Sequence, residues 1–273
     1  MDNYSVLMSV YGREKPDFLS QAITSIWTQT VATDDFVLMC DGPLTDELNA
    51  IIAQQEEDHP RTFRAVRILE NKGLGNALSV GIGECRNELI LRADSDDISL
   101  PRRAEKELAF LQENNLDILS SPVTLFSIDP KIPTGQRKVP LSSEEIRRFA
   151  QKRSPFNHPS VLFRKSAVIN AGNYSSNLRF RQDYFLWIKM IRNGAKAMNL
   201  SEPLVLMRSN ENLVRRRKNK EAHACSIWIM KYMRKTKFIG FHRYILDRLA
   251  YGFQYWAPSW LLSFVYKHIL HKS

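Results

Sequence analysis

Three aspartates crowd together in the segment LRADSDDISLP, where Asp94, Asp96 and Asp97 follow the apolar run at residues 89–91. Like charges this close repel one another, so we expect a nearby group to offset them. An EF-hand loop is excluded, because Ile98 and Ser99 stand where that loop needs a further ligand and a glycine. A carboxylate pair after a buried strand can instead hold a hard divalent cation that also binds phosphate oxygens. A polar turn without a metal is the alternative, since Asp and Ser favour turns.

Strands and helices alternate along the part of the chain that leads to this cluster. Short apolar runs predict strands at residues 5–10, 36–40, 64–69 and 89–91. Apolar spacing and turn signals predict helices at residues 18–27, 44–57 and 74–86. Such alternation is typical of a doubly wound α/β sheet, which binds ligands beyond the carboxyl ends of its strands. Asp41 and Asp94 each follow a predicted strand, so both are expected at that edge.

Beyond the cluster the pattern is more broken, and it contains a second acidic candidate. We expect helices at residues 101–115, 143–153 and 181–193, a strand at 160–163, and strand and loop at 119–140. Asp183 stands at the head of the last helix, where an acidic side chain is favoured in any case by the helix dipole. His158 precedes a proline, and Trp187 has the spacing of a core residue, so both also have purely structural interpretations.

The composition indicates a protein with a sizeable core and a local basic region. The 273 residues carry a net charge of +10, but eleven Lys or Arg against two Asp or Glu fall within residues 215–248, so the remainder is close to neutral. This favours a local anionic partner over a duplex-binding surface. Three separated cysteines without a CxxC spacing argue against disulfides and zinc and for a reducing compartment. The N-terminus does not have the pattern of a secretory signal.

Residues 249–266 carry no charge, and seven of these eighteen residues are aromatic. Their length is near the lower limit for a bilayer span, but Gly252, Gln254 and Pro258 interrupt them. Tyr and Trp favour the membrane–water interface, and the basic run precedes them. We therefore expect a helical, membrane-associating C-terminal extension that lies in the plane of an anionic membrane. A packed C-terminal subdomain and a true span are the alternatives.

Several segments, taken in order, resemble those of the family 2 glycosyltransferases with a GT-A fold, especially bacterial enzymes of capsule, exopolysaccharide and O-antigen assembly. The resemblance covers roughly residues 4–210, and the ordered set is far more specific than any single motif. It consists of SVLMSVYGREKPDFLSQAITSIWTQT, VLMCDGPLTDEL, ENKGLGNALSVGI, LRADSDDISLPRR with the DxD pattern, HPSVLFRKSAVINAGNY and RQDYFLWIKM.

The resemblance implies roles for individual residues. The fold would be a Rossmann-like, doubly wound mixed sheet of the GT-A type. Asp183 would be the general base, and Asp94 and Asp96 would bind Mn²⁺ or Mg²⁺. Donor binding is expected of Ser9, Val10, Tyr11, Asp41, Asn71, Lys72, Gly73, Asp94 and Arg208. Acceptor contacts are expected of His158, Gln182 and Trp187.

The activity implied is inverting, metal-dependent transfer of a sugar from a UDP-sugar, with glucose or galactose as first candidates. The acceptor would be a saccharide on a polyprenyl diphosphate, and the product a β-glycoside in bacterial surface polysaccharide. Residues 1–212 would form the catalytic domain and residues 213–273 the basic and aromatic extension. Such an enzyme would lie in the cytoplasm, peripherally on the inner face of the plasma membrane, with no nucleic-acid partner.

The chain departs from the family pattern at three positions. Leu78, Ser79 and Asn210 replace an arginine, an asparagine and a histidine that relatives often carry, which puts one diphosphate contact and one metal ligand in doubt. A sugar-nucleotide pyrophosphorylase would need a glycine-rich N-terminal loop, whereas VYGREK has one glycine. A non-catalytic membrane- or nucleic-acid-binding protein would act through the basic segment at residues 215–237.

Overall fold

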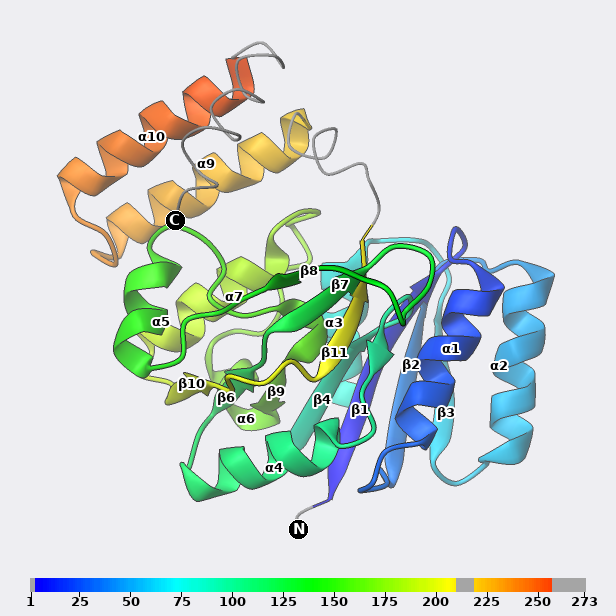
Figure 1. Cartoon of the computed structure of the whole chain (residues 1–273). Helices are drawn as coiled ribbons and strands as arrows, with labels where there is room; N and C mark the ends of the chain where they lie inside the picture. Colours follow the sequence, from blue (N-terminus) through cyan, green and yellow to red (C-terminus); the bar gives the residue numbers. More distant parts are fainter. Residues whose placement is uncertain (1–2, 210–218, 257–273) are drawn as a thin grey trace. The chain divides into compact units, whose positions relative to one another are not determined.

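The computed structural model describes residues 3–209 and 219–256 of the chain (Figure 1). Contacts divide the chain into two compact units after residue 210. The first unit contains both candidate carboxylate groups. The basic residues at 215–218 and the aromatic tail at 257–273 lie outside the described residues, as does Asn210.

A seven-stranded mixed sheet forms the centre of the first unit, in the order β10-β6-β9-β4-β1-β2-β3. Its strands are β1 (Tyr4–Tyr11), β2 (Asp35–Asp41), β3 (Phe63–Ile68), β4 (Leu89–Asp94), β6 (Ile118–Ser120), β9 (Leu162–Arg164) and β10 (Ala197–Asn199). The pairs among β1, β2, β3 and β4 are parallel, whereas β9 runs antiparallel to both β4 and β6. The four strands expected before the acidic cluster are therefore confirmed.

A smaller four-stranded sheet has the order β5-β11-β7-β8. Its strands are β5 (Ile98–Ser99), β7 (Val123–Phe126), β8 (Pro133–Arg137) and β11 (Val205–Arg208). Strand β5 directly follows the acidic cluster and pairs with β11, so the smaller sheet helps to fix the turn that carries the aspartates.

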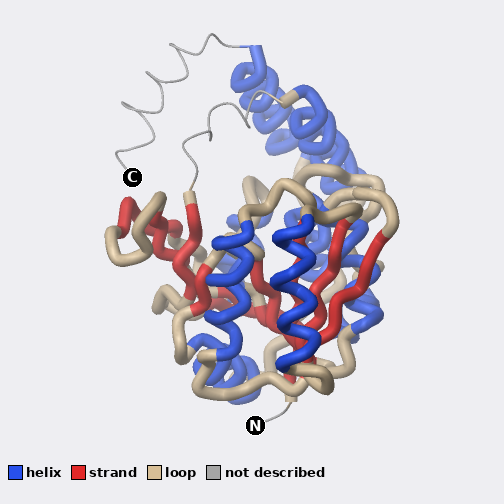
Figure 2. The backbone as a smooth tube through the Cα atoms, turned by 90° about the vertical axis from the view of Figure 1, so that its right-hand side faces the viewer, coloured by secondary structure: helices blue, strands red, loops and turns tan. Residues whose placement is uncertain are grey.

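Helices lie on both faces of the strands (Figure 2). They are α1 (Pro16–Trp27), α2 (Asp46–Asp58), α3 (Leu74–Glu84), α4 (Arg103–Glu113), α5 (Ser143–Ala150), α6 (Lys165–Asn170) and α7 (Gln182–Arg192), with a short 3-10 helix η1 (His158–Ser160). The six helices expected from the sequence are confirmed to within a few residues at each end, whereas α6 and η1 were not expected.

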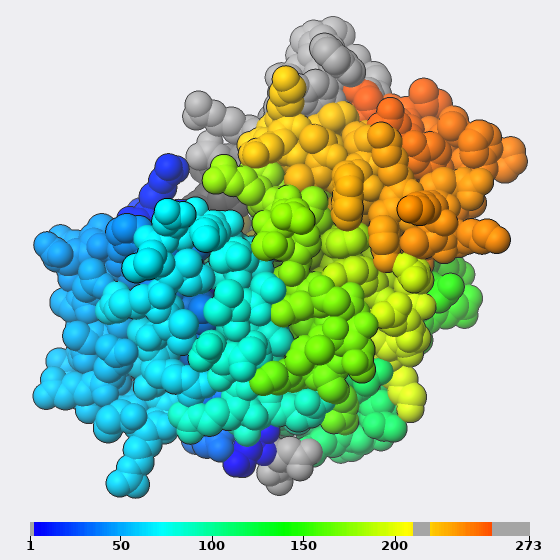
Figure 3. All heavy atoms as spheres, turned by 180° about the vertical axis from the view of Figure 1, so that it is seen from behind, coloured from blue at the N-terminus to red at the C-terminus, as the bar shows by residue number. Residues whose placement is uncertain are grey.

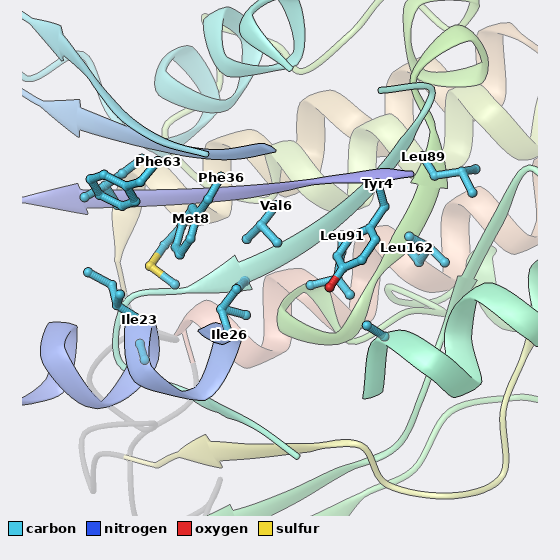
Figure 4. Packing of buried hydrophobic residues seen from close by; sticks show 14 of the residues in the cluster. Tyr4, Val6, Met8, Ile23, Ile26, Phe36, Phe63, Leu89, Leu91 and Leu162 are labelled. Atoms are coloured by element: carbon cyan, nitrogen blue, oxygen red, sulfur yellow. The ribbon is translucent and has the colours of Figure 1, made fainter. Parts of the chain in front are cut away.

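Alternating residues of β1 separate the two faces of the sheet. Tyr4, Val6, Met8 and Val10 are buried on the face that α1, α2 and α4 cover. Figure 4 shows Val6 and Met8 on the side of β1 that faces Ile23 and Ile26 of α1. On the opposite face α3 approaches so closely that a Cβ on Gly81 would lie 2.5 Å from Leu7 Cδ1. A strand with both faces buried reads as a nearly continuous apolar run, which is why the sequence revealed it.

The second unit contains two described helices, α9 (Lys220–Lys235) and α10 (Phe241–Trp256). Asn219 caps α9, because its Oδ1 accepts the backbone N–H groups of Glu221 (2.8 Å) and Ala222 (3.1 Å). Several large apolar side chains of these helices are exposed: Trp228, Phe241, Ile245, Leu246 and Leu249. Among the described helices, none combines the length and the apolar character that crossing a bilayer requires.

A buried ion pair joins the start of α4 to the strands beside it. Arg103 is fully buried; its Nε donates to Glu107 (3.0 Å), its Nη1 to Ser99 Oγ (3.0 Å) and its Nη2 to the carbonyl oxygen of Arg92 (2.8 Å). Arg103→Ala leaves the Glu107 carboxylate buried without its partner, so we expect the free energy of unfolding to fall by about 3–5 kcal/mol. Urea denaturation measures this. Arg102→Ala, which breaks an exposed pair, is the control and should change stability little; equal effects of the two variants would contradict the expectation.

Candidate active site

The carboxyl ends of β1, β2 and β4 bring the first group of expected site residues together. These strands are neighbours in the sheet (Figure 1), and their register pairs Ser9 with Asp94 and Tyr11 with Asp41. Residues separated by more than eighty positions in the sequence thus meet at one edge. This is the edge at which doubly wound sheets bind ligands.

Asp41 organises the loop that precedes α3. Its carboxylate accepts the backbone N–H groups of Lys72 and Gly73, each at 2.9 Å, and its carbonyl oxygen accepts Asn71 Nδ2 at 3.0 Å. Gly42 permits this approach, because it has a φ of +86° and a Cβ there would lie 2.7 Å from the backbone nitrogen of Asn71. Asp41 therefore shapes the Asn-x-Gly loop besides facing the pocket.

A pocket of about 550 Å³ opens at this edge of the sheet. It is lined by Tyr11, Gly12, Arg13, Asp41, Pro43, Asn71 and Arg179. Tyr11, Asp41 and Asn71 were expected there from the sequence, whereas Gly12, Arg13, Pro43 and Arg179 were not. The two arginines give the pocket the positive charge that a nucleotide phosphate would require.

The structure corrects the expectation that the side chain of Val10 faces the donor. Its side chain is 1% exposed and packs in the core on the α1 face of the sheet. Only its backbone can contribute to donor binding. The alternation along β1 could have indicated this, because Val10 continues the buried series of Tyr4, Val6 and Met8.

The acidic cluster lies beside this pocket edge, at the end of β4. Carboxylate oxygens of Asp94, Asp96 and Asp97 all lie within 4.8 Å of one another. Burial, with the nearby charges of Asp94 and Glu14, raises the pKa of Asp96 to about 6. Burial, with the nearby charges of Asp94 and Asp96, raises the pKa of Asp97 as well. Three crowded carboxylates suit a hard divalent cation, which would relieve the repulsion among them.

The three aspartates have different surroundings. The buried guanidinium of Arg92 binds Asp94 through Nη2. Asp97 is 6% exposed and accepts the backbone N–H of Arg208 at 2.8 Å, so it holds the turn. Ser95, between them, donates from Oγ to Glu14 at 2.6 Å and ties the first loop to the cluster. Asp94 and Asp96, both partly exposed, are the ones available to a cation.

Arg208 supports the turn in this structure, whereas the sequence led us to expect it at the donor. It is 7% exposed, and its guanidinium lies over the rings of Phe18 (3.7 Å) and Phe126 (4.5 Å). Its Nε donates to the carbonyl oxygen of Asp96 at 3.1 Å and its Nη2 to Gln21 at 3.1 Å. These contacts fix the acidic turn from the side of α1.

Asp183 lies in the first turn of α7. Burial raises the pKa of its carboxyl, while the positive charges of Arg137, Arg92 and Arg181 oppose that shift. The preceding Gln182 is packed against α3, since a Cβ on Gly75 would lie 3.2 Å from the Gln182 side chain. Figure 3 shows the surface of the α3 region (cyan) directly beside that of the residues that lead to α7 (yellow-green). The residue before Asp183 is thus held close to the start of α3.

His158 and Trp187 belong to one cluster of rings. His158 Nε2 is hydrogen-bonded to the hydroxyl of Tyr174 at 3.0 Å. Trp187 is fully buried, and its ring contacts those of Phe156 (5.6 Å between centroids), His158 (6.0 Å) and Tyr174 (6.2 Å). Trp187 therefore offers no free face to an acceptor sugar, which corrects the expectation; it supports α7 from the core.

Asp94 and Asp183 share neighbours. The negative charges of Asp183 and Asp94 both contribute to raising the pKa of Tyr174. The positive charge of Arg92 interacts with both aspartates as well. Arg92, Tyr174, Glu14 and Arg179 were not singled out from the sequence. Of these four residues, only Arg92 could have been noticed from the sequence, because it is a charged residue among the apolar residues of strand β4.

Comparison with known proteins agrees with this arrangement. Residues 5–172 match the family described as glycosyl transferase family 2. The chain is 33% identical, over 98% of its length and 97% of the relative's, to the Escherichia coli UDP-Gal:alpha-D-GlcNAc-diphosphoundecaprenol beta-1,3-galactosyltransferase. The structure of S. aureus TarS in complex with UDP-GlcNAc is similar with a TM-score of 0.67 and 15% identity, over 99% of this chain and 77% of that one.

A mannosyltransferase from Pyrobaculum calidifontis, PcManGT in complex with GDP-Man and Mn²⁺, also has a TM-score of 0.67, with 14% identity over 98% of this chain and 76% of that one. The fold is the mixed α/β fold of GT-A glycosyltransferases. The chain belongs to glycosyl transferase family 2.

Proposed function

We propose that the protein is an inverting, metal-dependent glycosyltransferase that moves a hexose from a UDP-sugar to a saccharide linked to a polyprenyl diphosphate. The observation that carries this proposal is the cluster of Asp94, Asp96 and Asp97 at the carboxyl end of β4, together with Asp183 in the first turn of α7 in the same unit. Such a transfer needs a group of carboxylates that binds the cation and a separate carboxylate that acts as the base.

Donor binding is assigned to the pocket at the ends of β1 and β2. Tyr11, Asp41 and Asn71 line it and would surround the nucleoside, with Arg13 and Arg179 close enough to serve the phosphates. Ser9 would contribute at the same edge, while Lys72 and Gly73 act through the backbone N–H groups that Asp41 holds. Asp94 and Asp96 would hold Mn²⁺ or Mg²⁺, which offsets the charge that develops on the leaving diphosphate.

The transfer step requires one base. Asp183 accepts the proton of the acceptor hydroxyl as that oxygen bonds to the anomeric carbon and the bond from this carbon to the UDP oxygen breaks. Attack from the face opposite the leaving group inverts the configuration, so a UDP-α-sugar gives a β-glycoside. Gln182 and His158, beside Asp183, are the residues proposed to orient the acceptor.

Galactose is the first donor to test, because the E. coli relative is a UDP-galactose enzyme that acts on a diphosphoundecaprenol-linked sugar. Radiolabelled UDP-galactose and UDP-glucose, incubated with a lipid-diphosphate-linked sugar and Mn²⁺, should give labelled lipid with one of them. A chelator should abolish the transfer, and Mn²⁺ should restore it. Transfer that persists undiminished with the chelator would refute the metal requirement. Formation of UTP and sugar 1-phosphate when pyrophosphate is added to the UDP-sugar would favour pyrophosphorylase chemistry.

The proposal extends to the place where the enzyme acts. We propose that residues 1–212 are catalytic and that residues 213–273 attach the protein to the cytoplasmic face of a bacterial plasma membrane. Support comes from the apolar side chains exposed on α9 and α10 together with the net positive charge of residues 215–248. The near-neutral remainder of the chain does not favour a nucleic-acid partner.

Vesicle binding tests this membrane assignment. We expect the protein to sediment with vesicles that contain anionic lipid and to bind neutral vesicles much less, because the basic residues attract the anionic surface. The double variant Leu246→Glu, Leu249→Glu places negative charge at two exposed apolar positions and should weaken sedimentation by at least about tenfold. Equal binding of the variant and the wild-type protein would contradict the assignment.

A further inference from the structure

The side chain of Arg92 is buried at the centre of the site with part of its hydrogen-bonding capacity unused. It is 1% exposed and lies on β4, two residues before Asp94. Nη2 binds the Asp94 carboxylate, but Nε and Nη1 are buried and have no hydrogen-bond partner among the described residues. A buried cation with unpaired N–H groups is costly, and native proteins rarely retain one without a reason.

Arg103 shows what a buried structural arginine looks like in the same chain. Each of its three nitrogen atoms donates to a partner: to Glu107, to Ser99 and to the backbone of Arg92 itself. None of these three hydrogen bonds is made to Asp94, Asp96 or Asp183. The contrast indicates that Arg92 is not kept for packing or for a closed hydrogen-bond network.

The charge of Arg92 reaches both halves of the site. It acts on Asp94 and Asp97 on the cation side and on Tyr174 on the other. It also opposes the rise that burial causes in the pKa of Asp183. Besides Arg92, the charged and titratable groups that face Asp183 are Arg137 from β8, Arg181 from the segment before α7, and Tyr174.

We propose that Arg92 is a positioning residue for Asp94. By its direct ion pair it orients the Asp94 carboxylate toward the donor and the cation. Its fixed positive charge also favours the ionised form of Asp183. This inference rests on the proposed function, because it assigns Asp94 to the donor side and Asp183 to proton removal.

Two substitutions separate these effects. Arg92→Met removes the charge and the ion pair; we expect the KM for the UDP-sugar to rise about tenfold, as for the loss of one charge-assisted hydrogen bond. The acid limb of the kcat–pH profile should also move upward by about one pH unit, because Asp183 loses a nearby positive charge. Arg92→Lys keeps the charge without the planar guanidinium, so KM should rise while the acid limb stays close to that of the wild-type protein.

Arg103→Lys is the matched control. It alters an equally buried arginine and should lower the melting temperature while leaving the acid limb and the donor KM unchanged. The inference would be overturned if the Arg92 variants fold and have the same donor KM and the same acid limb as an active wild-type protein. If Arg92→Met does not fold, the donor KM of Arg92→Lys decides alone, and a wild-type value overturns the inference. A wild-type protein that neither binds UDP nor transfers sugar would instead refute the proposed function.

Discussion

Asp183→Asn is expected to lower kcat for sugar transfer by about 100- to 10,000-fold, the range that general-base catalysis contributes. Asparagine keeps the size and the position at the start of α7 but does not accept the proton of the acceptor hydroxyl. The pocket at the ends of β1 and β2 is untouched, because Asp183 is not among its lining residues. UDP-sugar affinity should therefore stay within about twofold of the wild-type value. Single-turnover transfer and calorimetric titration with UDP measure the two quantities separately.

Glu144→Gln is the matched control for this substitution. Glu144 also lies in the first turn of a helix, α5, but its side chain is 80% exposed and pairs only loosely with Arg148 at 3.8 Å. It should leave kcat unchanged. Full transfer activity in Asp183→Asn would show that another group removes the proton.

The second large effect is expected at the acidic cluster. Asp96→Ala removes a carboxylate that is proposed to bind the cation directly. Changes in the outer shell of metal sites cost about 10- to 100-fold, so the loss of a direct ligand should weaken Mn²⁺-dependent UDP binding by at least roughly 100-fold, about 2.8 kcal/mol. Titration with UDP, with and without Mn²⁺, measures this. The variant should bind UDP equally weakly in both conditions.

Asp58→Ala provides the comparison for Asp96→Ala. Asp58 is exposed and ends α2, so it lies away from the carboxyl ends of the strands. This variant should keep the stimulation of UDP binding by Mn²⁺. If Asp96→Ala keeps that stimulation as well, the proposed cation site is wrong.

The larger sheet could be predicted from the sequence where strands were long and apolar on both faces. Val6, Leu7 and Met8 in β1 and the residues of β2 are all buried, so each strand reads as a continuous apolar run. The short strand β9 was expected as a strand, but not its antiparallel place between β4 and β6. A strand of three residues carries no pattern that specifies its direction. Its partners are fixed by tertiary packing.

Site residues that come directly after a strand could be predicted from the sequence. Site residues whose position depends on packing against distant parts of the chain could not. Asp41, Asp94 and Asp96 could be placed at the ligand edge because of their position after apolar runs. The burial of Arg208 between Phe18 and Phe126 could not, because it depends on a helix and a strand far away in the sequence. Arg179 reaches the pocket from the segment before α7, a placement that only the packed structure reveals.

A crystal of the protein with UDP and Mn²⁺ tests the central claim most directly, through the anomalous scattering of manganese. We expect a single strong peak about 2.2 Å from an oxygen of Asp96 and from a phosphate oxygen of UDP, with Asp94 beside it. The uracil and ribose should occupy the pocket lined by Tyr11 and Asp41. A manganese peak away from both aspartates, or UDP bound outside that pocket, would contradict the proposed site.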